Sequence, residues 1–250
     1  MNGHKGLTEA SISSPRGTIR TYQRVLFIQL GRTGHRLMGH LGTRELRRRL
    51  WHMSPGFLPF ILWAIPHRDP ISPTLRIIII SMIAGLGLRI LWGFSRIRRH
   101  GESSDRGIGA VMGYALSVLA CLLLFPGQAE ISLGVLGILA FGDGSATFIG
   151  LVCRGKKLPW NPSKTWFGMV GFIVFGTLMS AIIYWGETHN LEARTPGVSF
   201  HTALLIAFLA TLPAAVAESL DVRLNDNIRV GVTAAVCLAS AHGWLVGWAG

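Results

Sequence analysis

The sequence is poor in charged residues, and especially in acidic ones. Only 14% of its 250 residues are Asp, Glu, Lys or Arg, and 24 basic residues stand against 12 acidic ones. Soluble domains carry about 25% charged residues, so this scarcity argues against an ordinary soluble domain. A nucleic-acid-binding protein would spread its basic residues over a water-exposed face, whereas this chain holds apolar runs of about 20 residues. We therefore expect a membrane protein and no nucleic-acid partner.

Clusters of cysteine or histidine are missing as well. The three cysteines, Cys121, Cys153 and Cys237, show no spacing typical of a metal or redox motif. None of the nine histidines belongs to an H-E-x-x-H pattern. The sequence therefore supports no disulfide framework and disfavours a zinc hydrolase.

Long apolar segments are what the sequence has in abundance. Most of them are long enough to cross about 30 Å of hydrocarbon at about 1.5 Å per residue. The first is short and holds three prolines, so a tilted or re-entrant path is the alternative to a full crossing. The pattern predicts an all-α, multi-pass transmembrane bundle of about seven spans, at 51–66, 74–94, 107–125, 131–152, 166–186, 200–217 and 230–248.

Residues 1–50 form a basic arm that carries ten Lys and Arg against two Glu. Cytoplasmic loops collect Lys and Arg, and the connections after the second and fourth segments are basic too. We therefore expect the arm in the cytoplasm and a transmembrane catalytic domain over 51–250. The arm has no apolar core of a signal peptide, although its Arg-rich composition is also compatible with an organellar transit peptide. The membrane would be the inner or plasma membrane in a bacterium and an organelle membrane in a eukaryote.

One carboxylate is expected at membrane depth. Asp143 stands between two glycines in FGDGSATFIG, over 141–150, late in the fourth segment. Ionisable groups at this depth are costly and usually functional. Asp143 is therefore a candidate to hold Mg²⁺ or to face a polar cavity. The alternative is a small-residue packing face whose aspartate is paired with an arginine.

The loop over 153–168 gathers cationic and hydroxyl side chains, which suit phosphate groups. It reads CRGKKLPWNPSKTWFG. A P-loop is excluded because Lys157 stands where that motif needs Ser or Thr. The alternative explanation is the positive-inside rule alone. The candidate phosphate-binding residues are Arg154, Lys156, Lys157, Ser163, Lys164 and Thr165.

Two further places carry polar groups. AESLDVRLNDNIRV, over 217–230, holds Glu218, Asp226 and Asn227, which could bind a divalent cation next to a nucleoside triphosphate. The alternative is an Asn- and Asp-rich turn in which Glu218 caps or pairs. His52 lies in RRRLWHMSPG, over 47–56, and a single histidine is more often structural than catalytic.

These four motifs, in this order, resemble the polyprenol kinase family, which includes dolichol, phytol and farnesol kinases and is related to the phosphatidate cytidylyltransferases. RRRLWH, GDGSATFIG, GKKLPWNPSKTWFG and ESLDVRLNDNIRV carry the resemblance, over about 47–232. It implies phosphoryl transfer, usually from CTP, to an isoprenoid alcohol. One position departs from the pattern, because Phe167 stands where a Glu is common. The C-terminal signature of the cytidylyltransferases is absent.

We therefore expect a membrane-embedded, CTP-dependent lipid-alcohol kinase. Asp143, Lys164 and Asp226 are the catalytic candidates, and Asp143, Glu218 and Asp226 would hold Mg²⁺ or Mn²⁺. Asn227 joins the basic loop in binding the nucleotide, and His52, at the membrane entry, is a further site candidate. A cytidylyltransferase that forms a CDP-lipid is the first alternative, and a non-catalytic membrane protein or transporter is the second. The sequence specifies neither the alcohol nor an oligomeric state.

Overall fold

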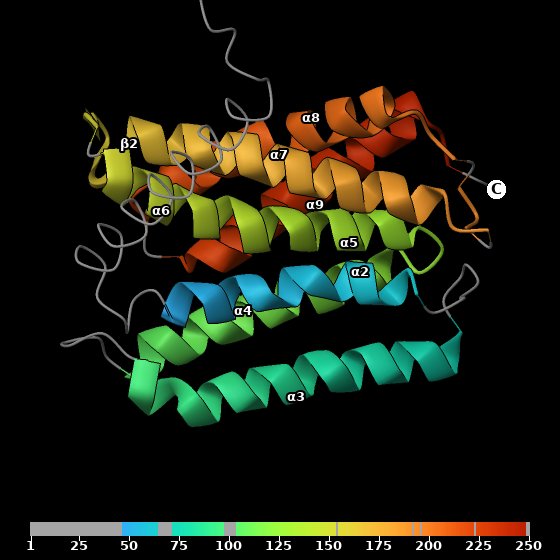
Figure 1. Cartoon of the computed structure of the whole chain (residues 1–250), viewed down its shortest axis with the longest axis horizontal. Helices are drawn as coiled ribbons and strands as arrows, with labels where there is room; N and C mark the ends of the chain where they lie inside the picture. The colour runs from blue at the N-terminus through green and yellow to red at the C-terminus, as the bar shows by residue number, and fades with distance from the viewer. Residues whose placement is uncertain are drawn as a thin grey trace, which may run out of the picture. The chain divides into compact units, whose positions relative to one another are not determined.

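The computed structural model describes residues 47–64, 72–97, 104–153, 155–191, 193–195, 197–222 and 224–248. The basic arm up to residue 46 and the candidate Arg154 lie outside the described residues. Within them the chain is almost entirely helical (Figure 1). The all-α fold class is therefore confirmed.

Four helices are long and apolar enough to cross a membrane among the residues that the structure describes. They are Ala129–Cys153, which comprises α5, η2 and α6, and then α7 (Trp166–Thr188), α8 (Phe200–Ser219) and α9 (Asp226–Leu245). Each matches one of the last four predicted segments. Whether the second and third predicted segments also cross the membrane stays a prediction, because some side chains of both lie outside the described residues to which this count applies.

The first predicted segment is a broken helical stretch. It consists of a helix over 47–53, a short 3₁₀ turn η1 (Ser54–Phe57) and α2 (Leu58–Leu62). Pro55 and Pro59 stand at the starts of the last two pieces, where a missing N–H costs nothing. We predicted one span over 51–66. The described part of this stretch is instead broken into short helices, none of which is long enough to be one of the four candidate spans.

This stretch nevertheless lies along the bundle. A Cβ on Gly144 would come within 2.5 Å of Met53, and one on Gly186 would come within 2.0 Å of Trp63. Only glycine fits at such close contacts. Gly144 begins the second half of the fourth span, whereas Gly186 lies near the end of α7. The stretch thus runs past much of the length of these helices.

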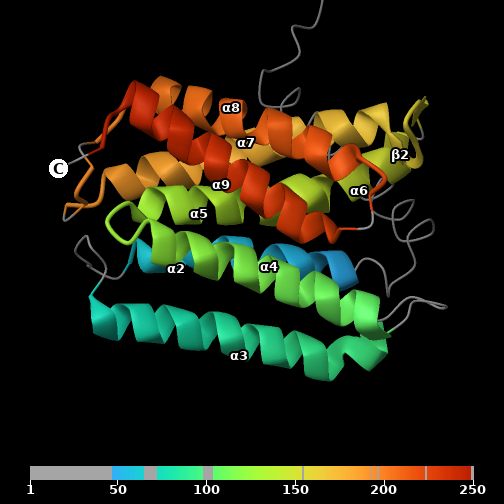
Figure 2. The ribbon, with the colours of Figure 1, turned by 180° about the vertical axis from the view of Figure 1, so that it is seen from behind.

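Two further helices, α3 (Pro73–Ile97) and α4 (Ser104–Leu124), coincide with the second and third predicted segments. Figure 2 shows α3 along α4 at the edge of the bundle, and α4 packs against α9 and α5. The Ser117 hydroxyl of α4 donates to the Asn227 carbonyl of α9 over 3.3 Å. Gly231 makes this approach possible, because a Cβ there would come within 2.4 Å of Ser117.

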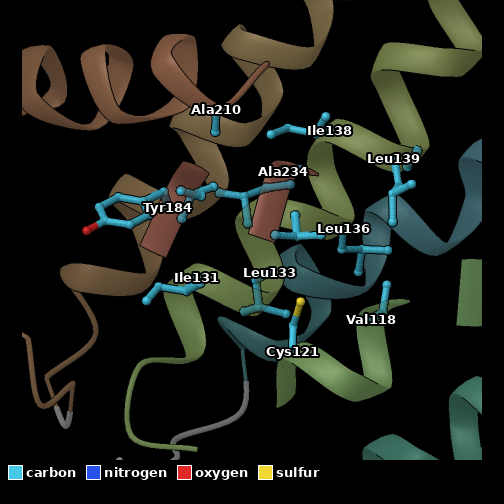
Figure 3. Close-up of a cluster of buried hydrophobic side chains, with 14 of the residues drawn as sticks. Val118, Cys121, Ile131, Leu133, Leu136, Ile138, Leu139, Tyr184, Ala210 and Ala234 are labelled. Atoms are coloured by element: carbon cyan, nitrogen blue, oxygen red, sulfur yellow. The ribbon is translucent and has the colours of Figure 1, made fainter. Parts of the chain in front are cut away.

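The centre of the bundle is the helix from α5 (Ala129–Gly137) through η2 (Ile138–Gly142) to α6 (Asp143–Cys153). Figure 3 shows side chains of α5 and η2, among them Leu133 and Ile138, meeting those of α4, α7, α8 and α9. The middle piece η2 is a π-helical turn that ends directly before Asp143. Such single π-turns within α-helices are frequent at functional sites. The three cysteines are free.

A short antiparallel hairpin links α6 to α7. Its strands are β1 (Lys157–Leu158) and β2 (Asn161–Thr165). Thr165 then caps α7, since its side chain accepts a hydrogen bond from the Gly168 N–H. Figure 1 shows the hairpin beside the end of α6, and hydrogen bonds join it to the end of α8. The two polar loops predicted at 153–168 and 217–230 are therefore neighbours at one end of the bundle.

Candidate active site

Asp143 receives two side chains from the first helical stretch. The Arg49 guanidinium lies 3.2 Å from Asp143 Oδ2, and His52 Nε2 lies at the same distance from that oxygen. His52 Nε2 is also 3.3 Å from the Leu139 carbonyl oxygen. Arg49 and His52 are three residues apart in a helix, so they share one face. The basic motif at 47–52 and the Gly-Asp motif thus meet in the structure.

Lys164 joins the loop at 153–168 to the one at 217–230. Its ammonium group forms a short ion pair with Glu218 and lies 4.0 Å from Asp226 Oδ2. Asp226 is also paired with Arg229, whose other terminal nitrogen donates to the Leu220 carbonyl over 3.0 Å. Glu218 is buried in this pair, whereas the Asp226 side chain is 57% exposed.

The two groups belong to one site. Asp143 interacts electrostatically with both Lys164 and Glu218. Asp143 lies ten residues before the end of α6, or about 15 Å at 1.5 Å per residue. Glu218, by contrast, is the next-to-last residue of α8. The site therefore reaches from the end of the bundle down into it, with Asp143 at the deeper level.

Two hydrogen bonds attach the hairpin to the end of α8. The Asn161 side-chain amide donates to the Ser219 carbonyl over 3.0 Å, and the Trp160 indole N–H donates to the Ser219 hydroxyl over 3.0 Å. Asn161 Oδ1 also accepts from the backbone N–H and the hydroxyl of Ser163. Because Ser219 follows Glu218 directly, these bonds hold Lys164 opposite its carboxylate partner.

The other predicted nucleotide-binding residues lie in different settings. Lys156 and Lys157 are exposed at the start of the hairpin, and Ser163 is exposed on β2. Thr165 uses its hydroxyl oxygen to cap α7. Asn227 is buried, and its N–H donates to the Asn225 side chain over 2.9 Å.

In the described part of the chain, protein side chains alone do not assemble a metal site. Among the described residues, no three His, Cys, Asp or Glu side chains lie close enough together to hold a metal ion. Asp143, Glu218 and Asp226 each have a cationic partner instead. Carboxylate oxygens nevertheless suit Mg²⁺, which is usually bound by one or two carboxylates together with substrate phosphates and waters. The donor types fit a metal that arrives with a nucleotide.

Three residues of this neighbourhood were not among the predicted site residues. Arg49 could have been found from its spacing of three to His52 on a helix. Arg229 has the same spacing to Asp226, which it pairs with. Tyr114 gave no such signal, because it is a lone aromatic residue within an apolar segment. Its ring stands edge-on to His52 with the ring centres 5.0 Å apart.

Phe167, which replaces a common Glu of the family pattern, lies outside the charged cluster described above. Its ring packs over Gly155, where a Cβ would come within 2.1 Å of it, and half of its surface is exposed. The position therefore contributes an apolar contact at the base of the hairpin.

Among the curated proteins to which the chain is similar are three that are named as phytol or farnesol kinases. It is 26% identical to phytol kinase 1, chloroplastic, from Arabidopsis thaliana, over 75% of this chain and 63% of that protein. It is 25% identical to the farnesol kinase, chloroplastic, of the same plant, over 79% and 67%. It is 28% identical to the probable phytol kinase 1, chloroplastic, of Glycine max, also over 79% and 67%. The chain is a homologue of the phytol and farnesol kinases.

The resemblance stated from the four motifs is thereby confirmed at the level of these kinases. The chain spans less than two thirds of the length of the first Arabidopsis relative. No family model matches the chain. No solved structure matches it either.

Proposed function

We propose that the chain transfers the terminal phosphoryl group of a nucleoside triphosphate, with CTP as the donor, to the hydroxyl of an isoprenoid alcohol. The names of its homologues point to alcohols such as phytol and farnesol. The chain would work as an integral membrane enzyme, in the inner or plasma membrane of a bacterium or in an organelle membrane. The homologues' chloroplastic names favour the organelle.

The observation that carries this proposal is the meeting of four motifs that are far apart in the sequence. Arg49 and His52 contact Asp143, and Lys164 contacts Glu218 and Asp226. A purely structural explanation of each motif, such as a positive-inside loop or an Asn-rich turn, does not require them to converge. Phosphoryl transfer does, because it depends on positioning and charge neutralisation rather than on a strong nucleophile.

The nucleotide would bind at the exposed part of the site. Lys156, Lys157 and Lys164, with Arg154 and the hydroxyls of Ser163 and Thr165, are the proposed phosphate ligands. In this proposal Lys164 exchanges part of its contact with Glu218 for phosphate oxygens. Asn227 borders the same loop. The hydrogen bonds of Asn161 and Trp160 to Ser219 keep the hairpin beside α8.

The alcohol would reach the deeper part of the site from the bilayer. Its oxygen forms a new bond to the γ-phosphorus, the bond from that phosphorus to the bridging oxygen breaks, and CDP leaves. Asp143 is the proposed acceptor of the alcohol proton, because it is the carboxylate that lies deepest. Arg49 and His52 hold that carboxylate by contacts of 3.2 Å each.

Mg²⁺ or Mn²⁺ is proposed to enter with the nucleotide, with Asp143, Glu218 and Asp226 as the carboxylates available to it. Bound there, a divalent cation would neutralise charge on the phosphates.

The position of a radioactive label in the product tests this function. Purified protein in lipid nanodiscs is incubated with Mg²⁺ and with CTP labelled at either the α- or the γ-phosphorus. Phytol, farnesol and phosphatidate are offered in separate reactions, and lipid products are separated by chromatography. We expect label on the prenol from γ-labelled CTP and none from α-labelled CTP.

Two outcomes would contradict the proposal. Label from α-labelled CTP on phosphatidate, with release of pyrophosphate, would identify a cytidylyltransferase. Absence of any labelled lipid, together with no Mg²⁺-dependent effect of CTP on thermal stability, would favour a transporter or a non-catalytic protein. Replacing CTP with ATP, GTP or UTP in the same assay measures the preference for the base.

A further inference from the structure

Tyr114 lies on α4, in contact with the deep part of the site. It is more than nine-tenths buried. Its ring stands edge-on to His52, the residue that contacts Asp143, with the ring centres 5.0 Å apart. Three different elements, the 47–53 helix, α4 and α6, therefore bring a histidine, a phenol and a carboxylate together.

The Tyr114 hydroxyl is buried but has no hydrogen-bond partner among the described residues. Buried polar groups are nearly always hydrogen-bonded. A buried group without a partner loses its hydrogen bonds to water and gains none within the protein, which lowers stability. The other described tyrosine follows this rule, since the hydroxyl of Tyr184 lies 2.6 Å from His242 Nδ1. Other buried hydroxyls of the described residues, such as those of Ser132 and Thr177, lack a partner too, but Tyr114 is in ring contact with the site residue His52. A ligand in the site is therefore well placed to supply the missing partner of Tyr114.

The chemistry of the site favours one part of the ligand. Phosphate oxygens are already matched with the cationic side chains around Lys164, near the end of the bundle. Tyr114 contacts the deeper group around Asp143, where the proposed function puts the reacting alcohol. An alcohol oxygen can donate its own proton to a carboxylate and at the same time accept a hydrogen bond from a phenol. One lone pair then remains for attack on phosphorus.

We propose that Tyr114 is a substrate-binding residue whose hydroxyl donates a hydrogen bond to the oxygen of the acceptor alcohol. This inference rests on the proposed function and deepens it. Tyr114 and Asp143 would hold the alcohol oxygen from two sides, one as donor and one as acceptor. The pair would recognise the hydroxyl end of the alcohol, whatever the length of its apolar chain.

The first test separates the two substrates of the reaction. Tyr114→Phe keeps the ring and its contact with His52 but removes the donor. We expect KM for the alcohol to rise about tenfold, as for the loss of one hydrogen bond, while KM for CTP stays unchanged. The matched control is Tyr184→Phe, a fully buried tyrosine of α7 whose hydroxyl pairs with His242 rather than with a site residue. It should leave both KM values unchanged.

An unchanged KM for the alcohol in Tyr114→Phe would overturn the inference. A rise in KM for CTP without one for the alcohol would overturn it too, because the hydroxyl would then bind the nucleotide. Equal effects of the two Tyr→Phe variants on the alcohol would show general loosening of the bundle rather than a contact with substrate.

A methyl ether of the prenol gives a second, more selective readout. The ether oxygen accepts hydrogen bonds but has no proton to donate, so it can bind without reacting. We expect Tyr114→Phe to raise its inhibition constant about as much as it raises KM for the alcohol. An inhibition constant that does not change with Tyr114→Phe would contradict a hydrogen bond from Tyr114 to this oxygen.

Binding without nucleotide distinguishes failure of this inference from failure of the proposed function. The alcohol alone should raise the thermal stability of the wild-type protein by mass action, and should do so less in Tyr114→Phe at the same concentration. If that difference is seen but no phosphorylated prenol forms, Tyr114 binds the alcohol and the kinase proposal is wrong. If prenol is phosphorylated and the stabilisation is equal in both proteins, the inference about Tyr114 is wrong.

Discussion

The two ends of the bundle hold polar residues of similar types in opposite settings. We call the group of Arg49, His52, Asp143, Lys164, Glu218 and Asp226 the open cluster. The closed cluster comprises Glu130 of α5, Tyr184 of α7, Thr195 and His242 of α9. Along the central helix, Glu130 lies 13 residues before Asp143, or about 20 Å at 1.5 Å per residue. Both clusters contain a carboxylate and a histidine.

Access to water is what separates the clusters. In the closed cluster Glu130, Tyr184 and His242 are 0% exposed. The Thr195 hydroxyl donates to Glu130 over 2.5 Å, and His242 Nδ1 lies 3.7 Å from the same carboxylate oxygen. In the open cluster the Asp143, Lys164 and Asp226 side chains remain accessible to solvent. The same residue types therefore serve stability where they are sealed, and can receive a ligand where they are reachable.

The largest predicted effect on stability is at the closed cluster. Glu130→Ala removes the acceptor of Thr195 and leaves a cavity among buried polar groups, so we expect a loss of about 3 kcal/mol in unfolding free energy. The matched variant at the open cluster, Asp226→Ala, should cost at most about 1 kcal/mol, because that side chain is largely exposed. Thermal unfolding in detergent measures both, and equal losses would remove the distinction between the clusters.

Lys164 should affect both stability and activity. Lys164→Met removes a phosphate ligand and leaves Glu218 buried without that cation, so we expect kcat/KM for CTP to fall about 100-fold, together with a lower melting temperature. Adding Glu218→Gln should restore most of the stability but not the activity. Recovery of activity in the double variant would mean that Lys164 serves only to neutralise Glu218.

The smallest effect concerns the attachment of the hairpin. Asn161→Asp keeps the acceptor for Ser163 but turns the donor to the Ser219 carbonyl into a repelling oxygen. We expect KM for CTP to rise about tenfold or less and KM for the alcohol to stay the same. Trp160→Phe, which removes the second bond to Ser219, should act in the same direction. Initial rates at varied CTP check this, and a change in KM for the alcohol instead would contradict it.

The long apolar helices of this fold follow directly from the sequence. The predicted segments at 131–152, 166–186, 200–217 and 230–248 lie within two or three residues of the observed helices at most ends, because their length and composition leave few alternatives. The stretch over 51–66 was harder to predict. Its prolines break the helix, and its contacts with Gly144 and Gly186 depend on residues far along the chain.

The open cluster was largely foreseeable because its polar residues interrupt apolar segments and follow a family pattern. The π-helical turn before Asp143, the strands of the hairpin and the bonds to Ser219 were not foreseen, since they arise from tertiary contacts. The closed cluster was missed altogether. The predicted segment begins at residue 131, yet Glu130 already lies buried in the first turn of α5. The other members of the cluster, Tyr184, Thr195 and His242, lie one each in three other segments. No local sequence pattern therefore predicts the cluster.

The most direct measurement compares turnover in Asp143→Asn and Glu130→Gln, normalised to the amount of folded protein and made with CTP and a prenol. Each variant removes one carboxylate charge from one cluster and keeps the size of the side chain. The account predicts that Asp143→Asn loses activity about 1000-fold, as for removal of a general base, and that Glu130→Gln turns over like the wild type. Turnover retained in Asp143→Asn and lost in Glu130→Gln would contradict it.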